Sequence, residues 1–268
     1  MAREATDTAP ATASEHRTGS QAIERAISIL NLFAGDHGEL GVSEIARRTD
    51  LRISTAHRIV RALCVARFLE QDPRTERYRL GRSIALLGQR AMGHLGIELV
   101  RPDLERLVDA TGESAGVGVR QGSDLLVVME ASSAQRLRFD HPIGATIRLH
   151  ASAMGKAVLA FSGRDLKELV EELGPLERYT TRTITTKARL IAELESVRAI
   201  GYAVNREERY DGVSGVAAPI VDREGIARGA VGVQGPVVRL NESTVPAIAT
   251  KVVDLARTIA STLPIGRW

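Results

Sequence analysis

Residues 51–63 read LRISTAHRIVRAL, and this stretch decides the fold of the N-terminal part of the chain. Its apolar residues recur with helical spacing, so the segment predicts an amphipathic helix that begins at Ser54. The side expected to face a core carries Ala56, Ile59, Val60 and Leu63. The opposite side carries Ser54, Thr55, His57, Arg58 and Arg61. That polar face could be merely solvated, or it could read DNA, because an arginine can bind both acceptors on the major-groove edge of guanine.

Two further helices are predicted before this one. Ser20 is placed to cap a helix over residues 21–34, whose apolar stripe consists of Ile23, Ile27, Leu30 and Ala34. Ser43 is expected to cap a short helix that buries Ile45 and Ala46 and ends in a tight turn. Two short helices joined by such a turn, after a leading helix, form a helix-turn-helix.

A basic hairpin is predicted directly after these helices. Tyr78 and Leu80 alternate with arginines, as in a half-buried strand, and residues 72–75 (Asp-Pro-Arg-Thr) suit a type I turn. The hairpin places Arg74, Arg77 and Arg79 at or near its tip. It could be a charged, solubilising hairpin, but after a helix-turn-helix it is typical of a wing that contacts phosphate or the minor groove. Ten arginines against five acidic residues between positions 42 and 82 also indicate a nucleic-acid-binding surface.

The rest of the chain predicts an α+β domain. Residues 83–95 predict a linker helix, and Gly112 is expected to stop the helix that follows it. Strand pairs are predicted within 114–132 and 215–235. The predicted helices of this part span about residues 153–161, 164–173, 187–200 and 242–262, the last capped by Asn241 or Ser243. Antiparallel strands with helices at both ends indicate the α+β class.

Composition and motifs narrow the class of function. The single cysteine, Cys64, excludes an intrachain disulfide. No apolar run approaches the roughly 20 residues of a membrane span, and the N-terminus lacks the pattern of a signal peptide, so the expected location is cytoplasmic. Gly155-Lys156 lacks the other residues of a P-loop, and no G-x-S-x-G elbow or closely spaced histidine pair occurs. We expect no enzyme activity, cofactor or metal. The alternative is an enzyme or signalling protein that assembles its site from distant residues and uses the helix-turn-helix for docking.

Six motifs carry a resemblance to a known family. In the N-terminal part they are SQAIERAISIL (20–30), LRISTAHRIVRALCVARFLE (51–70) and YRLG (78–81). In the C-terminal part they are LHASAMGKAVLA (149–160), RAIGYAVNREERYDGVSGVAAPI (198–220) and GAVGVQGP (229–236). In this order they resemble the isocitrate lyase regulator (IclR) family of bacterial transcription factors, from about residue 20 to the C-terminus. The resemblance implies a winged-helix repressor or activator, dimeric or tetrameric, that binds a pseudo-palindromic operator.

By this resemblance, the C-terminal domain is a GAF-like sensor, an antiparallel α+β domain with a pocket for a small-molecule effector. The expected segments are a disordered tail (1–19), a winged helix-turn-helix domain (20–82), a linker helix (83–96) and an effector-binding domain (97–268). Such a bacterial regulator is expected in the cytoplasm, and at the nucleoid when it is bound to its operator.

The resemblance also implies two sets of site residues. DNA contacts are implied for Ser43, Arg52, Ser54, Thr55, His57, Arg58, Arg61, Arg74, Arg77 and Arg79. Effector contacts are implied for Phe139, Ile147, Ala153, Met154, Asn205, Val213, Gly215, Gly232 and Gln234. Where some members carry an Asp and a Cys, this chain has Asn205 and Gly215, which removes two polar partners of a small carboxylate and adds room. We therefore expect a bulkier catabolic metabolite rather than glyoxylate or pyruvate.

Overall fold

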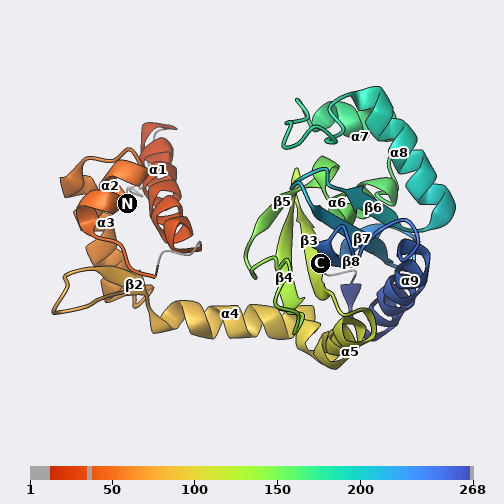
Figure 1. The fold of residues 1–268 in the computed structure, drawn as a ribbon. Coiled ribbons are helices and arrows are strands. Elements are labelled where there is room, and N and C mark those ends of the chain that lie inside the picture. Colours follow the sequence, from red (N-terminus) through yellow and green to blue (C-terminus); the bar gives the residue numbers. More distant parts are fainter. Residues whose placement is uncertain (1–12, 35–37, 266–268) are drawn as a thin grey trace, which may run out of the picture. The chain divides into compact units, whose positions relative to one another are not determined.

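The computed structural model describes residues 13–34 and 38–265, which form two compact units divided in sequence between Arg90 and Ala91 (Figure 1). The first unit consists of α1 (Ala13–Asn31), α2 (Val42–Arg48), α3 (Ile53–Val65), β1 (Leu69–Gln71) and β2 (Tyr78–Leu80). Helix α4 (Arg82–Leu95) crosses the division and connects the two units covalently.

The core of the first unit forms where the helices meet the hairpin. Ala46 of α2 and Ala56 and Val60 of α3 are buried together, as the helical pattern predicts. Asp50, whose φ is 52°, lies in the short turn between α2 and α3. Tyr78 of β2 is buried in the same core. The predicted helix-turn-helix with a following hairpin is therefore present.

Helix α1 starts earlier than the sequence predicts. It begins at Ala13 instead of at a cap on Ser20, so it includes part of the segment 1–19 that was expected to be a disordered tail. Residues 13–18 contain neither proline nor glycine, and they therefore allow the helix to continue towards the N-terminus. Residues 1–12 lie outside the described part of the chain.

The buried face of α1 also differs from the predicted stripe, of which only Leu30 packs against the core. Ile29 of α1 and Phe33, in the short 3-10 turn that follows, are buried, whereas Ile23 and Ile27 are 63% and 51% exposed. The core residues that this segment contributes all lie near Ile29 and Phe33. Among the side chains that the structure describes, those of α1 before Ile29 do not contribute to this core.

The predicted Ser43 cap of α2 is wrong, and α3 begins at Ile53, one residue before the predicted start at Ser54. Gly41 occupies the N-cap position of α2 and Arg52 that of α3, and neither helix has a side-chain cap. Ser43 and Ser54 lie inside the first turn of their helices instead. Helix α2 starts at Val42, one residue before Ser43, and Val42 packs against the core as a helical residue.

The turn of the hairpin is one residue longer than the predicted type I turn. The N–H of Glu76 donates to the carbonyl oxygen of Asp72 at 2.9 Å, and Glu76 has a φ of 56°. The Asp72 carboxylate accepts from the N–H of Arg74 at 2.7 Å, which is the usual role of Asp at the start of a turn. Leu80, expected to face inward with Tyr78, is 41% exposed, because β2 ends there and the chain enters α4.

An antiparallel six-stranded sheet forms the middle of the second unit (Figure 1). Its strands are β3 (Ser114–Gln121), β4 (Asp124–Ala131), β5 (Thr146–Arg148), β6 (Ala203–Arg206), β7 (Val213–Val221) and β8 (Ala227–Pro236). They lie in the order β5-β4-β3-β8-β7-β6. The predicted hairpins β3–β4 and β7–β8 are present, whereas both edge strands, β5 and β6, were missed because their three and four residues carry little alternation. The α+β class is confirmed.

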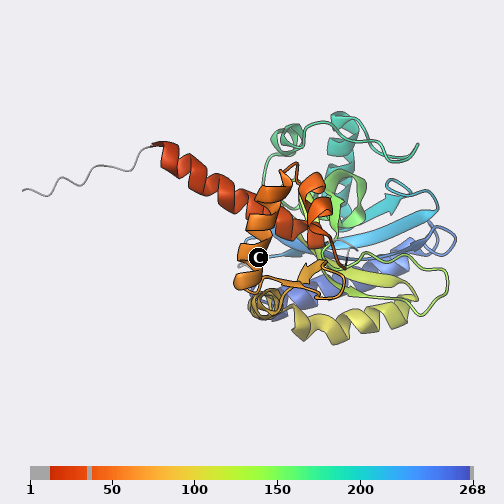
Figure 2. The same cartoon turned by 90° about the vertical axis from the view of Figure 1, so that its left-hand side faces the viewer.

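Helices cover both faces of this sheet (Figure 2). On one face lie α5 (Arg101–Thr111) and α9 (Val245–Thr262), and on the other α6 (Ala153–Ala160), α7 (Leu166–Glu172) and α8 (Lys187–Ile200). Each face has its own apolar core, and adjacent residues of one strand serve opposite cores: Val231 of β8 faces α9 and Ala230 faces α6. This alternation is what a sheet covered on both faces requires.

The predicted cap of the last helix, α9, is also wrong. The N-cap position is Thr244, not Asn241 or Ser243, and it makes no side-chain cap. The Asn241 side-chain oxygen instead accepts from the N–H of Ser243 at 3.0 Å and forms a turn before the helix. Pro246 lies in the first helical turn, where its missing N–H costs no helical hydrogen bond.

Candidate functional sites

The exposed face of α3 is the first candidate site. Thr55 is half-buried there, and the residues that are exposed on it are Ser54, His57, Arg58 and Arg61. Ser43 and Arg52, at the starts of α2 and α3, are exposed as well. Within the described part of this unit, the ion-paired arginines lie on α2 and the hairpin, so Arg58 and Arg61 remain free of intramolecular salt bridges. The face thus presents free guanidinium groups beside hydroxyl groups near a helix N-terminus, the chemistry that binds bases and phosphates.

The hairpin arginines differ in how they are held. The Arg77 Nη2 donates to the carbonyl oxygen of Glu39 at 2.8 Å and lies 3.3 Å from a carboxylate oxygen of Glu44. Arg79 lies 3.9 Å from a carboxylate oxygen of Glu39 and 3.7 Å from one of Glu70. Arg74 is exposed at the turn. Two of the three hairpin arginines expected to contact DNA therefore also tie the hairpin to its own unit.

This difference predicts unequal salt effects at the hairpin. Arg74→Ala should weaken binding to any duplex and reduce the slope of log K against log salt by about one unit, because an exposed arginine at a phosphate releases counterions on binding. Arg77→Ala, the matched variant, should change that slope less, because the Arg77 guanidinium is already held by the carbonyl oxygen of Glu39 and by the Glu44 carboxylate that it shares with Arg48. Fluorescence anisotropy with one random duplex at several salt concentrations measures both slopes. Equal changes would assign Arg77 to phosphate too.

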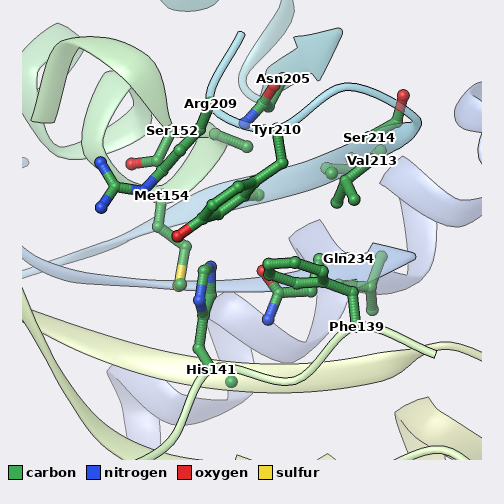
Figure 3. Close-up of a pocket in the computed structure, with 17 residues that line it drawn as sticks. Phe139, His141, Ser152, Met154, Asn205, Arg209, Tyr210, Val213, Ser214 and Gln234 are labelled. Atoms are coloured by element: carbon green, nitrogen blue, oxygen red, sulfur yellow. The ribbon is translucent and has the colours of Figure 1, made fainter. Parts of the chain in front are cut away.

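The second candidate site is a cavity in the second unit, bounded by β7, β8 and the start of α6 (Figure 3). Eight of the nine residues that the sequence analysis placed in a pocket line it, and Ile147 does not. Ile147 is buried in β5 beside Leu125, at the opposite end of the sheet order from β7. The lining residues are Gly116, Phe139, His141, Ser152, Ala153, Met154, Asn205, Arg209, Tyr210, Val213, Ser214, Gly215, Val216, Ala217, Gly232, Val233 and Gln234.

Sequence reasoning missed several side chains of this cavity, above all His141, Ser152, Arg209 and Tyr210. Arg209 and Tyr210 closely follow Asn205 in the quoted motif, and a cation next to an aromatic residue was the available signal. His141 lies in a long connection between β4 and β5 that has no helix or strand. No periodic pattern could have placed it.

Backbone forms the floor of the cavity. Gly116 of β3 pairs with Gly232 of β8, and Gly215 of β7 pairs with Gln234 of β8. A Cβ at Gly232 would lie 2.7 Å from the carbonyl oxygen of Val216, closer than real side chains approach. The glycine is therefore required by the close approach of the strand backbones.

Both polar atoms of the Asn205 side chain form hydrogen bonds within the protein. Its Nδ2 donates to the carbonyl oxygen of Ala151 at 3.2 Å, and its Oδ1 accepts from the N–H of Glu208 at 2.8 Å. These bonds join the loop after β6 to the segment before α6. Asn205 lines the cavity, but its polar atoms hold the loop in place.

Aromatic rings close the cavity. The ring centroid of Phe139 lies 4.9 Å from that of Tyr210 and 5.4 Å from that of His141. Burial, and next the charge of Arg209, lower the pKa of His141 to about 4, so its imidazole is neutral at pH 7. The volume left is about 30 Å³, room for about two water molecules. A metabolite must therefore displace side chains, and Tyr210, which is 43% exposed, is the ring at the surface.

Among the residues that the structure describes, no three His, Cys, Asp or Glu side chains are arranged to hold a metal ion. No helix in this part of the chain has the length and hydropathy to cross a bilayer. The cavity offers hydrogen-bonding groups, aromatic rings and one guanidinium.

Comparisons with known proteins agree for both units. Residues 22–73 match the family described as the IclR helix-turn-helix domain, and residues 90–261 match the bacterial transcriptional regulator IclR C-terminal family. The HTH-type transcriptional regulator BhcR of Paracoccus denitrificans is 37% identical over 248 residues, which cover 92% of this chain and 88% of that protein. The glycerol operon regulatory protein of Streptomyces griseus is 36% identical over 254 residues, covering 92% and 98%. The crystal structure of the Thermotoga maritima IclR superposes with a TM-score of 0.72 at 26% identity, covering 91% of this chain and 99% of that one.

Proposed function

Because the chain belongs to the IclR family of bacterial transcriptional regulators, with a DNA-binding helix-turn-helix domain and an effector-binding domain, we propose that α3 reads a pseudo-palindromic operator. The exposed arginines of α3, which no acid of the described residues pairs, are the observation that supports this role. Arg58 and Arg61 would contact bases, and Ser54, Thr55 and His57 would contact bases or phosphates. Arg74 would add a phosphate contact from the wing.

The proposed operator requires more than one copy of the chain. One α3 reads one half-site, and two such helices enter successive major grooves when their centres are about 34 Å apart. Leu86 and Leu87 on α4 are 61% and 54% exposed, which supports a dimer or tetramer that covers these apolar side chains. The regulator would reside in the cytoplasm and associate with the nucleoid when bound.

The cavity of the second unit is proposed to bind the effector, a catabolic metabolite larger than glyoxylate or pyruvate. A metabolite that binds one arrangement of the subunits better than another shifts the population towards it. Helix α4 is the covalent route by which such a shift reaches the DNA-binding units. Any change in the separation of the two α3 helices then changes operator affinity.

DNA footprinting with genomic fragments tests this function most directly. The purified protein is expected to protect two segments one helical turn, or a multiple of it, apart. Metabolites of the enzymes encoded beside the protected site would then be added, and one of them should change the protection. Absence of any protected segment at modest salt would contradict the proposal.

The competing function is an enzyme whose helix-turn-helix serves only for docking. The relatives reported above are transcriptional regulators, which supports a sensor. After incubation with the protein, a metabolite that alters operator binding should be recovered unchanged, as chromatography can show. Steady consumption of it would favour the enzyme.

A further inference from the structure

Ile53 is an exposed apolar side chain at the first residue of α3. It is 57% exposed, and it is not among the described side chains that pack against the core of this unit, whereas Leu51 before it and Ile59 after it are. Burial in the core therefore does not account for an isoleucine at this position. Its neighbours Arg52 and Ser54 are exposed and polar, so Ile53 presents an apolar surface between groups that suit phosphates and bases.

The position of Ile53 within α3 indicates what this side chain contacts. When a helix-turn-helix binds DNA, residues at the N-terminal end of its second helix lie against base edges in the major groove. Ile53 lies at that end, and His57, one helical turn further on, is exposed on the same side of the helix. Val65, the last residue of α3, is 86% exposed, but at 1.5 Å per residue it lies about 18 Å further along the helix. Ile53 is thus the exposed apolar residue at the end of α3 that meets the bases.

Thymine is the base whose major-groove edge carries an apolar group. Its C5 methyl group projects into the groove, whereas the other three bases present hydrogen-bond donors and acceptors there. An isoleucine side chain forms no hydrogen bonds, but it can shield the methyl group from water. Because isoleucine is β-branched, its χ1 is already restricted in a helix, and little side-chain freedom is lost when the contact forms.

We propose that Ile53 selects a thymine in each half-site of the operator by packing against the C5 methyl group of that base. Arg58 and Arg61 would read hydrogen-bonding edges, and Ile53 adds a contact that depends on a single methyl group. The inference rests on the proposed function, because it assumes that α3 enters the major groove. It concerns which base is recognised there, so the two can fail separately.

Uracil is a suitable probe, because it pairs with adenine as thymine does and lacks only the C5 methyl group. Operator duplexes taken from the footprint would carry uracil at one pair of symmetry-related thymines at a time. Competition gel shifts at one salt concentration measure their affinities for the wild type. We expect one such pair to lower the affinity about ten- to twentyfold, because one methyl group buried in each of two half-sites corresponds to about three- to fivefold per half-site.

The variant Ile53→Ala tests whether Ile53 makes this contact. It should bind the unmodified operator about as weakly as the wild type binds the uracil operator, and it should no longer distinguish thymine from uracil at that pair. Its fold should be preserved, because the side chain is exposed and alanine favours a helix more than isoleucine does; circular dichroism checks this. Val65→Ala is the matched control, because it shortens an exposed apolar side chain at the other end of the same helix and should leave the discrimination unchanged.

Two results would overturn the assignment. The first is a wild type that binds equally well with uracil at every thymine of the operator, and the second is an Ile53→Ala protein that discriminates as the wild type does. The second result would assign the methyl contact to another side chain of α3, such as Thr55. Both would leave the proposed function intact, since the operator is still bound. A wild type that protects no DNA segment would contradict the proposed function and this inference together.

Discussion

Replacing Lys156 by methionine is expected to lower the free energy of unfolding of the second unit by about 3–5 kcal/mol. Lys156 is fully buried in α6. Its Nζ donates to carboxylate oxygens of Glu193 at 2.7 Å and Glu208 at 2.6 Å, and to the carbonyl oxygen of Val204 at 2.7 Å. Without the ammonium, the buried Glu208 carboxylate loses its cation and keeps only the N–H of Arg206, 3.3 Å from its Oε1, while its Oε2 already lacks a hydrogen-bond partner among the described residues.

Thermal unfolding followed by circular dichroism measures this loss. For a unit of this size, the expected decrease in Tm is about 6–20 °C. Glu193→Gln is the matched control: Glu193 is half-buried, and the amide can still accept from Lys156, so a loss of about 1 kcal/mol or less is expected. Adding Glu208→Gln to Lys156→Met should recover part of the stability, because the uncompensated charge disappears. An unchanged Tm in Lys156→Met would show that this ion pair contributes no stability.

The first unit could be predicted well because its signals are local. Helical spacing in residues 51–63 gave the correct core residues, Ala56 and Val60 among them. The prediction of buried residues failed where the apolar periodicity is compatible with either of two helix faces. Both the Ile23–Ile27 stripe of α1 and the pair formed by Ile29 and Phe33 have helical spacing, and which pair is buried depends on where the rest of the unit packs.

The cavity could be predicted only in part. Glycines and small residues on β7 and β8 belong to recognisable motifs, and the strands bring them together as expected. Arg209 and His141 come from connections whose course depends on tertiary hydrogen bonds, such as those of Asn205. The burial of Lys156 was also unpredictable, because a lysine is normally exposed and its acidic partners lie far away in sequence.

Replacing Arg58 by alanine is expected to weaken operator binding by about 1–3 kcal/mol per half-site, and to weaken binding to random DNA much less. The side chain is exposed on α3, one helical turn from Ser54, so it extends from the surface that the helix presents to a groove. A guanidinium that bonds to a guanine edge contributes to affinity only where that guanine is present, whereas a phosphate contact contributes on every sequence.

The ratio of operator to random affinity therefore separates the two roles of Arg58. Competition gel shifts at one fixed salt concentration would compare the wild type, Arg58→Ala and the control Arg90→Ala, which removes the same charge from the exposed surface of α4. The ratio should fall about ten- to a hundredfold for Arg58→Ala alone, since each 1.4 kcal/mol is a factor of ten. An equal loss on both DNAs would place Arg58 at the phosphate backbone and leave Arg61 as the candidate for base recognition. If Arg58→Ala then also reduced the salt slope by about one unit, the phosphate assignment would be independently supported, because only a backbone contact releases a counterion.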